Sequence, residues 1–522
     1  MQAPPPPARE TVRDHVDAWA EADPERPFLI APETGAVLSA RGLRAMAQEV
    51  SGQLAALGLR KDDKAAFLMD NGLWTTALFL GAMYGGRVVV PLNAVAGRDQ
   101  LAYVLEHSDA KVLFVSARYR EKFAPLLAEF ADRVSVVAAD QDRGIEYSPS
   151  GDTAAADALA PVEPDDVGVL IYTSGTTGRP KGVLMTHRNA LAGGRNTAVA
   201  HELSGDDRVL CVLPLYHING EMVTVMAPLV SRGSVVMPHR YSTSQFWALI
   251  TQHRCTWFSV VPTIVAYLLE RSERDGGAFD RASMPQLRFG RSASAPLSPA
   301  MHETFEQRFQ VPMIETMGLT ETAAQILSNP MPPTPPRYGS PGVPYGNEAK
   351  IIDKQGRELG PGEEGELIIR GPNVAPGYYK NPEATREALS DDGWLRTGDL
   401  ARRDEDGYYF ITGRLKEIII KGGENIAPRE IDETLYQHPA VLEAAAFAVV
   451  DERYGQEVMA CVVLKPGAQC TEAELAAFCA DRLGSFKSPK EVHFLDTLPK
   501  GPSGKIQRLK LAEHIQAGAQ HP

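Results

Sequence analysis

The stretch GVLIYTSGTTGRPKG, residues 168–182, joins an apolar run to a loop rich in glycine and hydroxyl side chains. The run GVLIY has the length and composition of a buried strand. In the loop, Gly175 and Gly178 permit backbone conformations that aim N–H groups inward, and Lys181 adds a positive charge to the Thr and Ser hydroxyls. We predict a cradle for a polyphosphate at the end of a strand, and a flexible surface loop is the alternative interpretation.

The loop differs from the Walker pattern GxxxxGK[ST]. Its lysine, Lys181, follows Pro180 and precedes Gly182, so no Ser or Thr stands beside it to hold a magnesium ion. The segment therefore does not indicate a P-loop NTPase.

Apolar runs alternate with helix-like stretches on both sides of this loop. The runs lie at 65–69, 88–92, 208–213, 234–238 and 256–261. Strands that alternate with helices predict layered parallel α/β subdomains. Such sheets bind ligands at the carboxyl ends of their strands, which is where the glycine-rich loop falls.

The sequence changes character in its second half. Residues 332–346 are rich in Pro and Gly, and the short runs after them indicate a small β-barrel-like subdomain. The last hundred residues have the pattern of a compact α+β unit. We predict a large N-terminal domain over residues 1–412 and a small mobile C-terminal domain over residues 413–522, with a hinge near Lys416.

Composition excludes several classes of protein. The net charge of −13 disfavours nucleic acid and anionic membranes as partners. The five cysteines form no zinc-binding spacing, which favours free thiols in a reducing compartment. The start, MQAPPPPARE, lacks an apolar signal core, and residues 71–86 are too short and broken for a spanning helix, so we expect a buried core helix there. The expected location is cytoplasmic; no sustained heptad specifies an oligomeric state, and a homo-oligomer is compatible with the sequence.

Further motifs accompany the phosphate loop. They are PLYHING (214–220), SASAPL (292–297), ETMGLTE (315–321), DGWLRTGD (392–399), GRLKEIIIKGGENIAPREI (413–431) and PKGPSGKIQR (499–508). Together, and in this order, they resemble the adenylate-forming (ANL) superfamily over essentially the whole chain. That superfamily includes acyl-CoA synthetases, luciferases and peptide-synthetase adenylation domains.

The resemblance implies a two-step reaction with ATP. A carboxylate attacks the α-phosphate to give an acyl-adenylate and pyrophosphate, and a thiol, expected to be coenzyme A, then takes the acyl group. Both reactants of the first step are anions, so the site must neutralise charge and hold an in-line geometry. The residues implied for ATP and AMP are Thr173, Ser174, Gly175, Thr176, Thr177, Gly178, Lys181, Ser294, Ala295, Pro296, Glu315, Thr316, Met317, Gly318, Thr320, Asp399, Ile411, Arg414 and Lys505.

The resemblance gives particular roles to a few of these residues. Lys505 is expected to reach the α-phosphate and the attacking carboxylate, where it stabilises charge in the transition state. Glu321, with Thr176 nearby, is expected to bind Mg²⁺. Asp399 is expected to accept the two ribose hydroxyls, and His217 to shape the acyl pocket rather than act as an acid or base.

The second step requires Lys505 to leave the site. The resemblance implies that the small domain rotates about Lys416 and presents its other face. That face carries Lys421, Gly422 and Gly423, where the two glycines allow a thin pantetheine arm to pass close to the backbone.

The residues expected around the acyl group indicate a branch of the family. They are His217, Asn219, Glu221, Arg291, Met317 and Ala324. The segments FGRSASAPL (289–297), TWFSVVPT (256–263) and LPKGPSGKIQR (498–508) look nearest to the oxalate–CoA ligase branch. That branch carries further histidines where Asn219 and Ala324 stand, which leaves a small or polar acid as the expectation. Glu221 either points into the pocket, where it would favour a neutral or cationic acyl tail, or forms a salt bridge.

The acceptor has one main alternative to coenzyme A. An enzyme of this kind can load a separate carrier protein, although no carrier-protein serine motif follows the C-terminal unit. Luciferase-like oxidation and a silent scaffold with this fold are further alternatives, and the presence of Lys181, Glu321, Asp399 and Lys505 argues against the scaffold.

Overall fold

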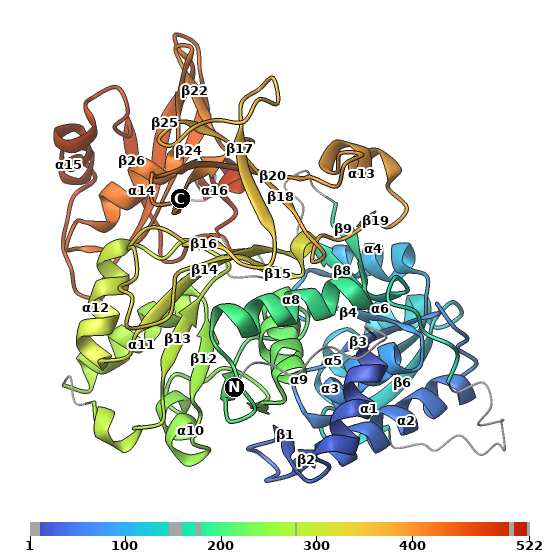
Figure 1. The fold of residues 1–522 in the computed structure, drawn as a ribbon. Helices are drawn as coiled ribbons and strands as arrows, with labels where there is room; N and C mark the ends of the chain where they lie inside the picture. Colours follow the sequence, from blue (N-terminus) through green and yellow to red (C-terminus); the bar gives the residue numbers. More distant parts are fainter. Residues whose placement is uncertain (1–10, 146–158, 174–178, 277–278, 501–505, 519–522) are drawn as a thin grey trace.

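The computed structural model describes residues 11–145, 159–173, 179–276, 279–500 and 506–518. It has the predicted α/β fold, in which two large sheets with flanking helices form the body and smaller sheets form the second half of the chain. Figure 1 shows the C-terminal elements above the body, next to β14–β16.

The first large sheet has nine strands in the order β16-β15-β14-β13-β12-β10-β11-β1-β2. They are β16 (Val343–Pro344), β15 (Ala324–Ser328), β14 (Met313–Leu319), β13 (Phe289–Ser292), β12 (Trp257–Val260), β10 (Arg208–Cys211), β11 (Ser234–Val236), β1 (Pro27–Ile30) and β2 (Val37–Ser39). The strands from β1 to β14 are parallel, with Leu210 opposite Phe258 and Gly290 opposite Met313. The carboxyl ends of β12, β13 and β14 therefore meet at one edge.

The second large sheet has eight strands in the order β19-β9-β8-β4-β3-β5-β6-β7. They are β19 (Gly377–Tyr378), β9 (Lys181–Thr186), β8 (Val167–Thr173), β4 (Val88–Pro91), β3 (Lys64–Leu68), β5 (Ala110–Val115), β6 (Ser135–Asp140) and β7 (Gly144–Ile145). Strands β8, β4, β3, β5 and β6 are parallel. β8 and β9 flank the glycine-rich loop as an antiparallel pair.

The helices pack on both sheets, and the long helix α3 is buried over its whole length, as is the short helix α9. The helices are α1 (Val12–Ala22), α2 (Ala40–Ala56), α3 (Leu73–Tyr84), α4 (Arg98–Ser108), α5 (Ala117–Lys122), α6 (Ala124–Phe130), α8 (His187–Ala200), α9 (Ala227–Ser231), α10 (Phe246–Gln252), α11 (Pro262–Arg274) and α12 (Pro299–Phe309). Every residue of α3 is buried, and the helix has no charged side chain. The predicted core helix within residues 71–86 is thus confirmed.

The second half of the chain builds two smaller sheets. β17 (Glu348–Ile352), β18 (Glu364–Arg370), β20 (Leu395–Arg403) and β21 (Tyr409–Arg414) form an antiparallel sheet. α13 (Pro382–Ala388) lies between β19 and β20 in the chain. The last sheet holds β22 (Ile419–Lys421), β23 (Glu424–Ile426), β24 (Val441–Asp451), β25 (Gly455–Leu464) and β26 (Glu491–Phe494), with α14 (Pro428–Tyr436), α15 (Glu472–Leu483) and α16 (Leu511–Gly518).

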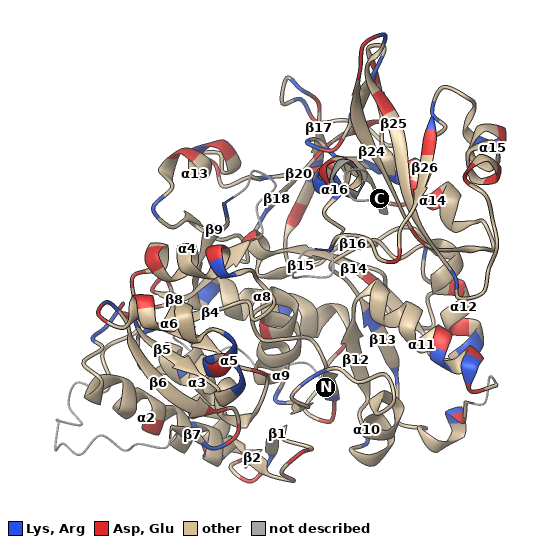
Figure 2. Cartoon of the chain, turned by 180° about the vertical axis from the view of Figure 1, so that it is seen from behind, with Lys and Arg blue, Asp and Glu red and all other residues tan. Residues whose placement is uncertain are grey.

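Charge is mixed over the outer helices. In Figure 2, where the ribbon is coloured by residue type, α11, α13 and α15 each carry both acidic and basic residues. Among the described helices, none combines the length and the apolar character that a bilayer-spanning segment needs.

Candidate active site

A cavity of about 300 Å³ lies between the body and the C-terminal elements. Residues of the body that were predicted to hold the nucleotide meet in its wall: Ser294, Ala295, Pro296, Glu315, Thr316, Met317, Gly318, Asp399, Ile411 and Arg414. Residues from the other side of the hinge complete the wall: Glu417, Arg429, Asp432, Glu433, Lys500, Ile506 and Arg508. We call this cavity the nucleotide cleft.

The carboxyl ends of β13 and β14 place the residues expected around the adenine. Ser294 follows β13 with a φ of 72°, a left-handed conformation that turns the chain into the cleft. Glu315, on β14, is buried and accepts a hydrogen bond from the Leu297 N–H at 3.0 Å. Burial raises the pKa of Glu315. The two segments are thereby fixed to each other across the parallel sheet.

A partly buried ion pair lies where the ribose is expected. Asp399 on β20 is opposite Arg414 on β21, and the Arg414 Nε donates to the Asp399 carboxylate. Asp399 is 4% exposed, and its charge is the main cause of a raised pKa for Arg414. The second nitrogen of Arg414 is 3.5 Å from the other Asp399 oxygen, so that oxygen keeps capacity to accept ligand hydroxyls.

Tyr378 links two residues of the expected phosphate site. The Lys181 ammonium lies over the Tyr378 ring, 4.8 Å from its centroid, and the Tyr378 hydroxyl donates to Glu321 Oε1 at 2.9 Å. Thr320 and Glu321 stand on a 3₁₀ turn, η3 (Thr320–Thr322), directly after β14. Ser174–Gly178 and Lys505 lie outside the described residues. The β19–β9 pairing that brings Tyr378 to Lys181 joins distant segments, so no local signal in the sequence indicated it.

Arg291 was predicted to lie at the acyl end of the site. Its guanidinium is fully buried and donates to Asn219 Oδ1 at 3.1 Å, Ser259 Oγ at 3.1 Å and Gln325 Oε1 at 3.3 Å. All three acceptors are neutral, and no described carboxylate pairs with this guanidinium. Burial lowers the pKa of Arg291 to about 9, so the group is charged at neutral pH.

Asn219 connects Arg291 with the nucleotide cleft. Its Nδ2 donates to Ser294 Oγ at 3.4 Å, while its Oδ1 accepts from Arg291 and from Ser259. Ser259 on β12 and Gln325 on β15 were not predicted. Ser259 reaches Arg291 because it lies directly opposite it on the neighbouring strand β12. Gln325 reaches Arg291 from β15, which begins at Ala324 and pairs antiparallel with β14.

Glu221 is a buried carboxyl beside this cluster in the chain. It lies on the π-helix η1 (Asn219–Met226), and its N–H donates to the carbonyl of His217 at 3.1 Å. Neither carboxyl oxygen has a hydrogen-bond partner among the described residues. Burial raises the pKa of Glu221 well above its usual value. The imidazole of His217 lies against Tyr216, with ring centroids 4.8 Å apart.

The C-terminal elements begin at the expected hinge. Lys416 is exposed in the turn at 415–417, between β21 of one sheet and β22 of the next. The ends of the segment that contains Lys505 are Lys500 and Ile506, and both line the nucleotide cleft. The face that carries Lys500 and Ile506 is therefore turned toward the predicted nucleotide residues in this structure.

The residues expected to meet coenzyme A lie elsewhere. The Lys421 ammonium is 2.5 Å from a Glu457 carboxylate oxygen and donates to the Phe486 carbonyl at 2.9 Å, and its side chain is buried. Gly422 and Gly423 are exposed with φ of 57° and 87°. A Cβ on Gly423 would meet no atom within 4 Å, so the positive φ rather than crowding calls for glycine there.

Comparison with known proteins agrees with this architecture. The sequence pattern of the family described as AMP-binding enzyme matches residues 16–379, and that of the AMP-binding enzyme C-terminal domain matches residues 430–505. Sulfoacetate–CoA ligase of Cupriavidus necator is 48% identical over 491 residues, which cover 94% of this chain and 95% of that protein. Oxalate–CoA ligase of Arabidopsis thaliana is 36% identical, over 88% of this chain and 89% of that protein.

A solved structure has the same fold over nearly the full length. ATP-bound MatB from Rhodopseudomonas palustris superposes with a TM-score of 0.89 at 30% identity, covering 97% of this chain and 99% of that one. The chain therefore belongs to the AMP-binding enzyme family. It is an AMP-forming acyl-CoA ligase that activates carboxylic acids, near the oxalate–CoA ligase branch of the adenylate-forming superfamily.

Proposed function

We propose that the enzyme activates a short carboxylic acid that carries a second anionic group, with sulfoacetate as the first candidate. The observation that carries the proposal is the fully buried guanidinium of Arg291, which has only neutral hydrogen-bond partners among the described residues. A buried charge without a counter-ion is costly, and an anionic ligand group nearby would compensate it.

The burial of Glu221 supports an anionic rather than a cationic acyl tail. Burial raises the pKa of Glu221 and so favours its neutral form, whereas Arg291 stays cationic below its pKa of about 9. The charge balance of this pair therefore favours a negative group on the ligand. The named relatives support the same class of acid, because sulfoacetate and oxalate each carry a second acidic group.

The acyl end communicates with the cleft through Asn219. Arg291 polarises the amide of Asn219, and the opposite end of that amide donates to Ser294 in the cleft wall. The positive potential thus reaches the point where the acid and the α-phosphate would meet. Ala324 and Met317 would bound the space, and a short acid would fit between Asn219 and the nucleotide.

The phosphates of ATP would be held by the loop from Thr173 to Lys181. Glu321 and Thr176 would hold Mg²⁺, since Glu321 keeps one carboxylate oxygen outside its hydrogen bond with Tyr378 and offers the hard oxygen that this ion prefers. A bound Mg²⁺ neutralises phosphate charge. Lys181, kept in place over the Tyr378 ring, would add a fixed positive charge beside the same phosphates.

Lys505 would act in the first half-reaction and leave for the second. Since Lys500 and Ile506 line the cleft, the present orientation suits formation of the adenylate. Rotation about Lys416 would replace this face with Gly422 and Gly423, whose exposed backbone leaves room for pantetheine. Lys421 would support that face from within through Glu457 rather than contact coenzyme A through its side chain.

Acid-dependent ATP–pyrophosphate exchange tests the proposal. The acids to compare are sulfoacetate, oxalate and 3,3-dimethylbutanoate, whose neutral tert-butyl head has nearly the shape of the sulfonate. We expect exchange with sulfoacetate to exceed that with 3,3-dimethylbutanoate by at least about a hundredfold, as for the loss of one buried charge interaction. Equal exchange with both would reject an anionic tail, and release of acyl-CoA on addition of coenzyme A would separate the ligase from a carrier-loading enzyme.

A further inference from the structure

A second hollow of about 630 Å³ lies in the body, and its lining shares no residue with that of the nucleotide cleft. It is lined by the segments after β3, β5, β6 and β11, which include Asp70, Ser116, Asp140 and His239. In Figure 1, β3 and β6 lie in the lower half of the view, whereas the C-terminal elements lie at the top. The volume is within the range of roughly 300–1,000 Å³ that small-molecule sites occupy.

The hollow lies at a topological switch point of the second large sheet. From β3 the chain crosses to β4 on one side and then returns to β5 on the other side of β3. The segments that follow β3 and β5 therefore diverge, and Asp70 and Ser116 stand in the crevice between them. Open α/β sheets bind ligands at such crevices, outside the carboxyl ends of their strands.

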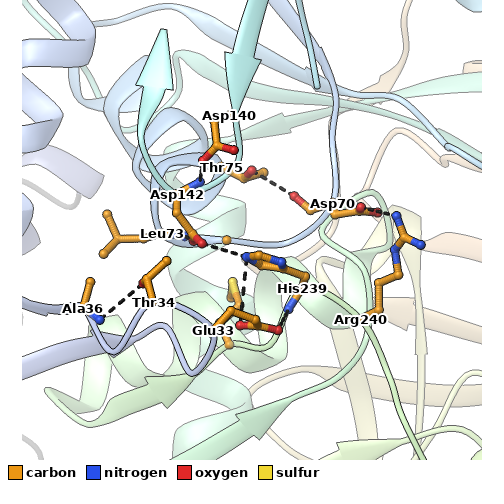
Figure 3. Close-up of polar contacts among 12 residues, drawn as sticks. Glu33, Thr34, Ala36, Asp70, Leu73, Thr75, Asp140, Asp142, His239 and Arg240 are labelled. Atoms are coloured by element: carbon orange, nitrogen blue, oxygen red, sulfur yellow. Dashed lines mark hydrogen bonds and ion pairs between the residues drawn. The ribbon is translucent and has the colours of Figure 1, made fainter. Parts of the chain in front are cut away.

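The carboxylates around the hollow are already used by the protein. Figure 3 shows both partners of His239. Its imidazole Nε2 lies 2.7 Å from Asp142 Oδ2, and its backbone N–H donates to Glu33 Oε1 at 2.8 Å. Asp70 accepts from Arg240, as Figure 3 shows. Its other carboxylate oxygen accepts from the Tyr119 hydroxyl at 2.6 Å.

The remaining carboxylate is also occupied. Asp140 Oδ1 accepts from the N–H groups of Asp142 at 3.0 Å and Arg143 at 2.9 Å. The acidic side chains of the hollow are therefore structural, and the donors that remain decide which ligand it suits.

Three donors in the wall have no such partner. Arg118 and Arg120 are exposed, line the hollow and form no ion pair with a described residue. Ser116 is 4% exposed, and its Oγ has no hydrogen-bond partner among the described residues, although it stands at the position that would cap α5. The Ser116 hydroxyl is buried, lines the hollow and has no hydrogen-bond partner among the described residues, so a polar atom of a ligand could satisfy it.

We propose that this hollow binds a small phosphate monoester. Arg118 and Arg120 both line the hollow, and their two guanidinium groups supply two positive charges for a phosphate dianion, whose oxygens arginine recognises in bidentate geometry. The Ser116 hydroxyl would donate to the same phosphate. Gln141 and Gln245, which also line the hollow, would bind hydroxyl groups on the body of the ligand. The structural carboxylates nearby disfavour ligands with several anionic groups, because like charges repel.

Calorimetric titration of the full-length protein with ribose 5-phosphate tests the proposal. The decisive variant is Arg118→Ala/Arg120→Ala, and the matched control is Arg308→Ala/Arg386→Ala, which removes the same charge from exposed positions on α12 and α13. We expect the first pair to weaken binding at least about tenfold and the control pair to leave it unchanged. Equal weakening by both pairs, or no weakening by the first, would overturn the proposal.

Two further probes define the ligand class. Ribose should not bind detectably, and methanesulfonate, with one charge, should bind more weakly than ribose 5-phosphate; tighter binding of methanesulfonate would contradict the phosphate assignment. Ser116→Ala should weaken ribose 5-phosphate severalfold without lowering the melting temperature of the free protein. Wild-type binding weaker than about 10 mM would also overturn the site.

Chemical protection locates the contact. Ribose 5-phosphate should slow phenylglyoxal modification of Arg118 and Arg120, read by peptide mass spectrometry, and leave Arg308 unaffected. Because none of these residues belongs to the proposed acyl or nucleotide sites, this result does not depend on the identity of the acid. Unprotected Arg118 and Arg120 would place the ligand elsewhere and reject the hollow.

Discussion

The nucleotide cleft and the acyl end treat charge in opposite ways. In the cleft, Arg414 pairs with Asp399, and Arg508 is buried between Asp432 and Glu417. At the acyl end, Arg291 and Glu221 are fully buried without any ion pair among the described residues. The chain thus pairs its charged side chains in the cleft, whereas Arg291 and Glu221 have no ion-pair partner among the described residues.

The difference indicates which region binds ATP, the same ligand in every turnover, and which region selects among acids. A paired charge costs less to bury than an isolated one, so the ion pairs of the cleft need no ligand charge to offset them. Uncompensated charges cost stability, and a protein keeps them where a ligand interaction offsets that cost. We infer that specificity for the acid resides with Arg291 and its neutral partners.

The largest expected effect concerns the cleft. Lys505→Ala should reduce acid-dependent pyrophosphate exchange by about a thousandfold, because it removes a charge that acts in the transition state. The same variant should still convert supplied acyl-adenylate to acyl-CoA. Lys510→Ala, on an exposed residue nearby, serves as the control. Equal loss of both half-reactions would contradict the proposal that the two faces of the small domain serve different half-reactions.

A smaller effect is expected from the ion pair in the cleft. Asp399→Asn should raise the KM for ATP by roughly ten- to a hundredfold, the range expected for hydrogen bonds to a charged group, and leave the preference among acids unchanged. Initial rates at varied ATP check this, with Asp391→Asn as an exposed control. A changed preference among acids would show that the two regions are not independent.

The pH dependence of the free energy of unfolding tests whether Glu221 is neutral in the folded protein. The pKa of this carboxyl is raised in the folded protein above its usual 4.5. The folded state therefore holds a proton that the unfolded state releases, and stability falls as pH rises through the window above 4.5. Glu221→Gln abolishes this cost, so its stability relative to wild type should grow by up to about 1.4 kcal/mol per pH unit in that window.

Denaturant unfolding at pH 5, 6 and 7 measures this trend. Glu405→Gln, at an exposed position, should show a difference from wild type that does not vary with pH. If the Glu221→Gln difference were also flat, Glu221 would be ionised in the folded protein, and the acyl end would carry no net positive charge.

Much of the nucleotide cleft could be predicted because the family motifs that imply its residues stand at or near strand ends. Ser294 and Glu315 are brought together because β13 and β14 are parallel neighbours, whereas Asp399 lies on the antiparallel strand β20. The uncharged stretch at 71–86 also predicted the buried helix α3, and the run GVLIY predicted the strand before the glycine-rich loop, but β9 after that loop was not predicted. Local patterns were sufficient wherever a residue's position follows from the strand that it terminates.

The remaining contacts depend on long-range pairing. Tyr378 reaches Lys181 through the short pair of β19 with β9, and Gln325 reaches Arg291 from a strand that adds to the far side of β14. Lys421 was expected at the coenzyme A face, but its alternation along β22 turns the side chain inward to Glu457. A sequence pattern does not specify which buried partner such a side chain meets.

The central claim is that Arg291 selects an acid with an anionic tail. The most direct test is the ratio of kcat/KM for sulfoacetate to that for 3,3-dimethylbutanoate, in the wild type and in Arg291→Gln, with melting temperatures to confirm folding. We predict that the substitution lowers the ratio by about a hundredfold, nearly all of it through sulfoacetate. An unchanged ratio, with both acids losing activity equally, would contradict the account.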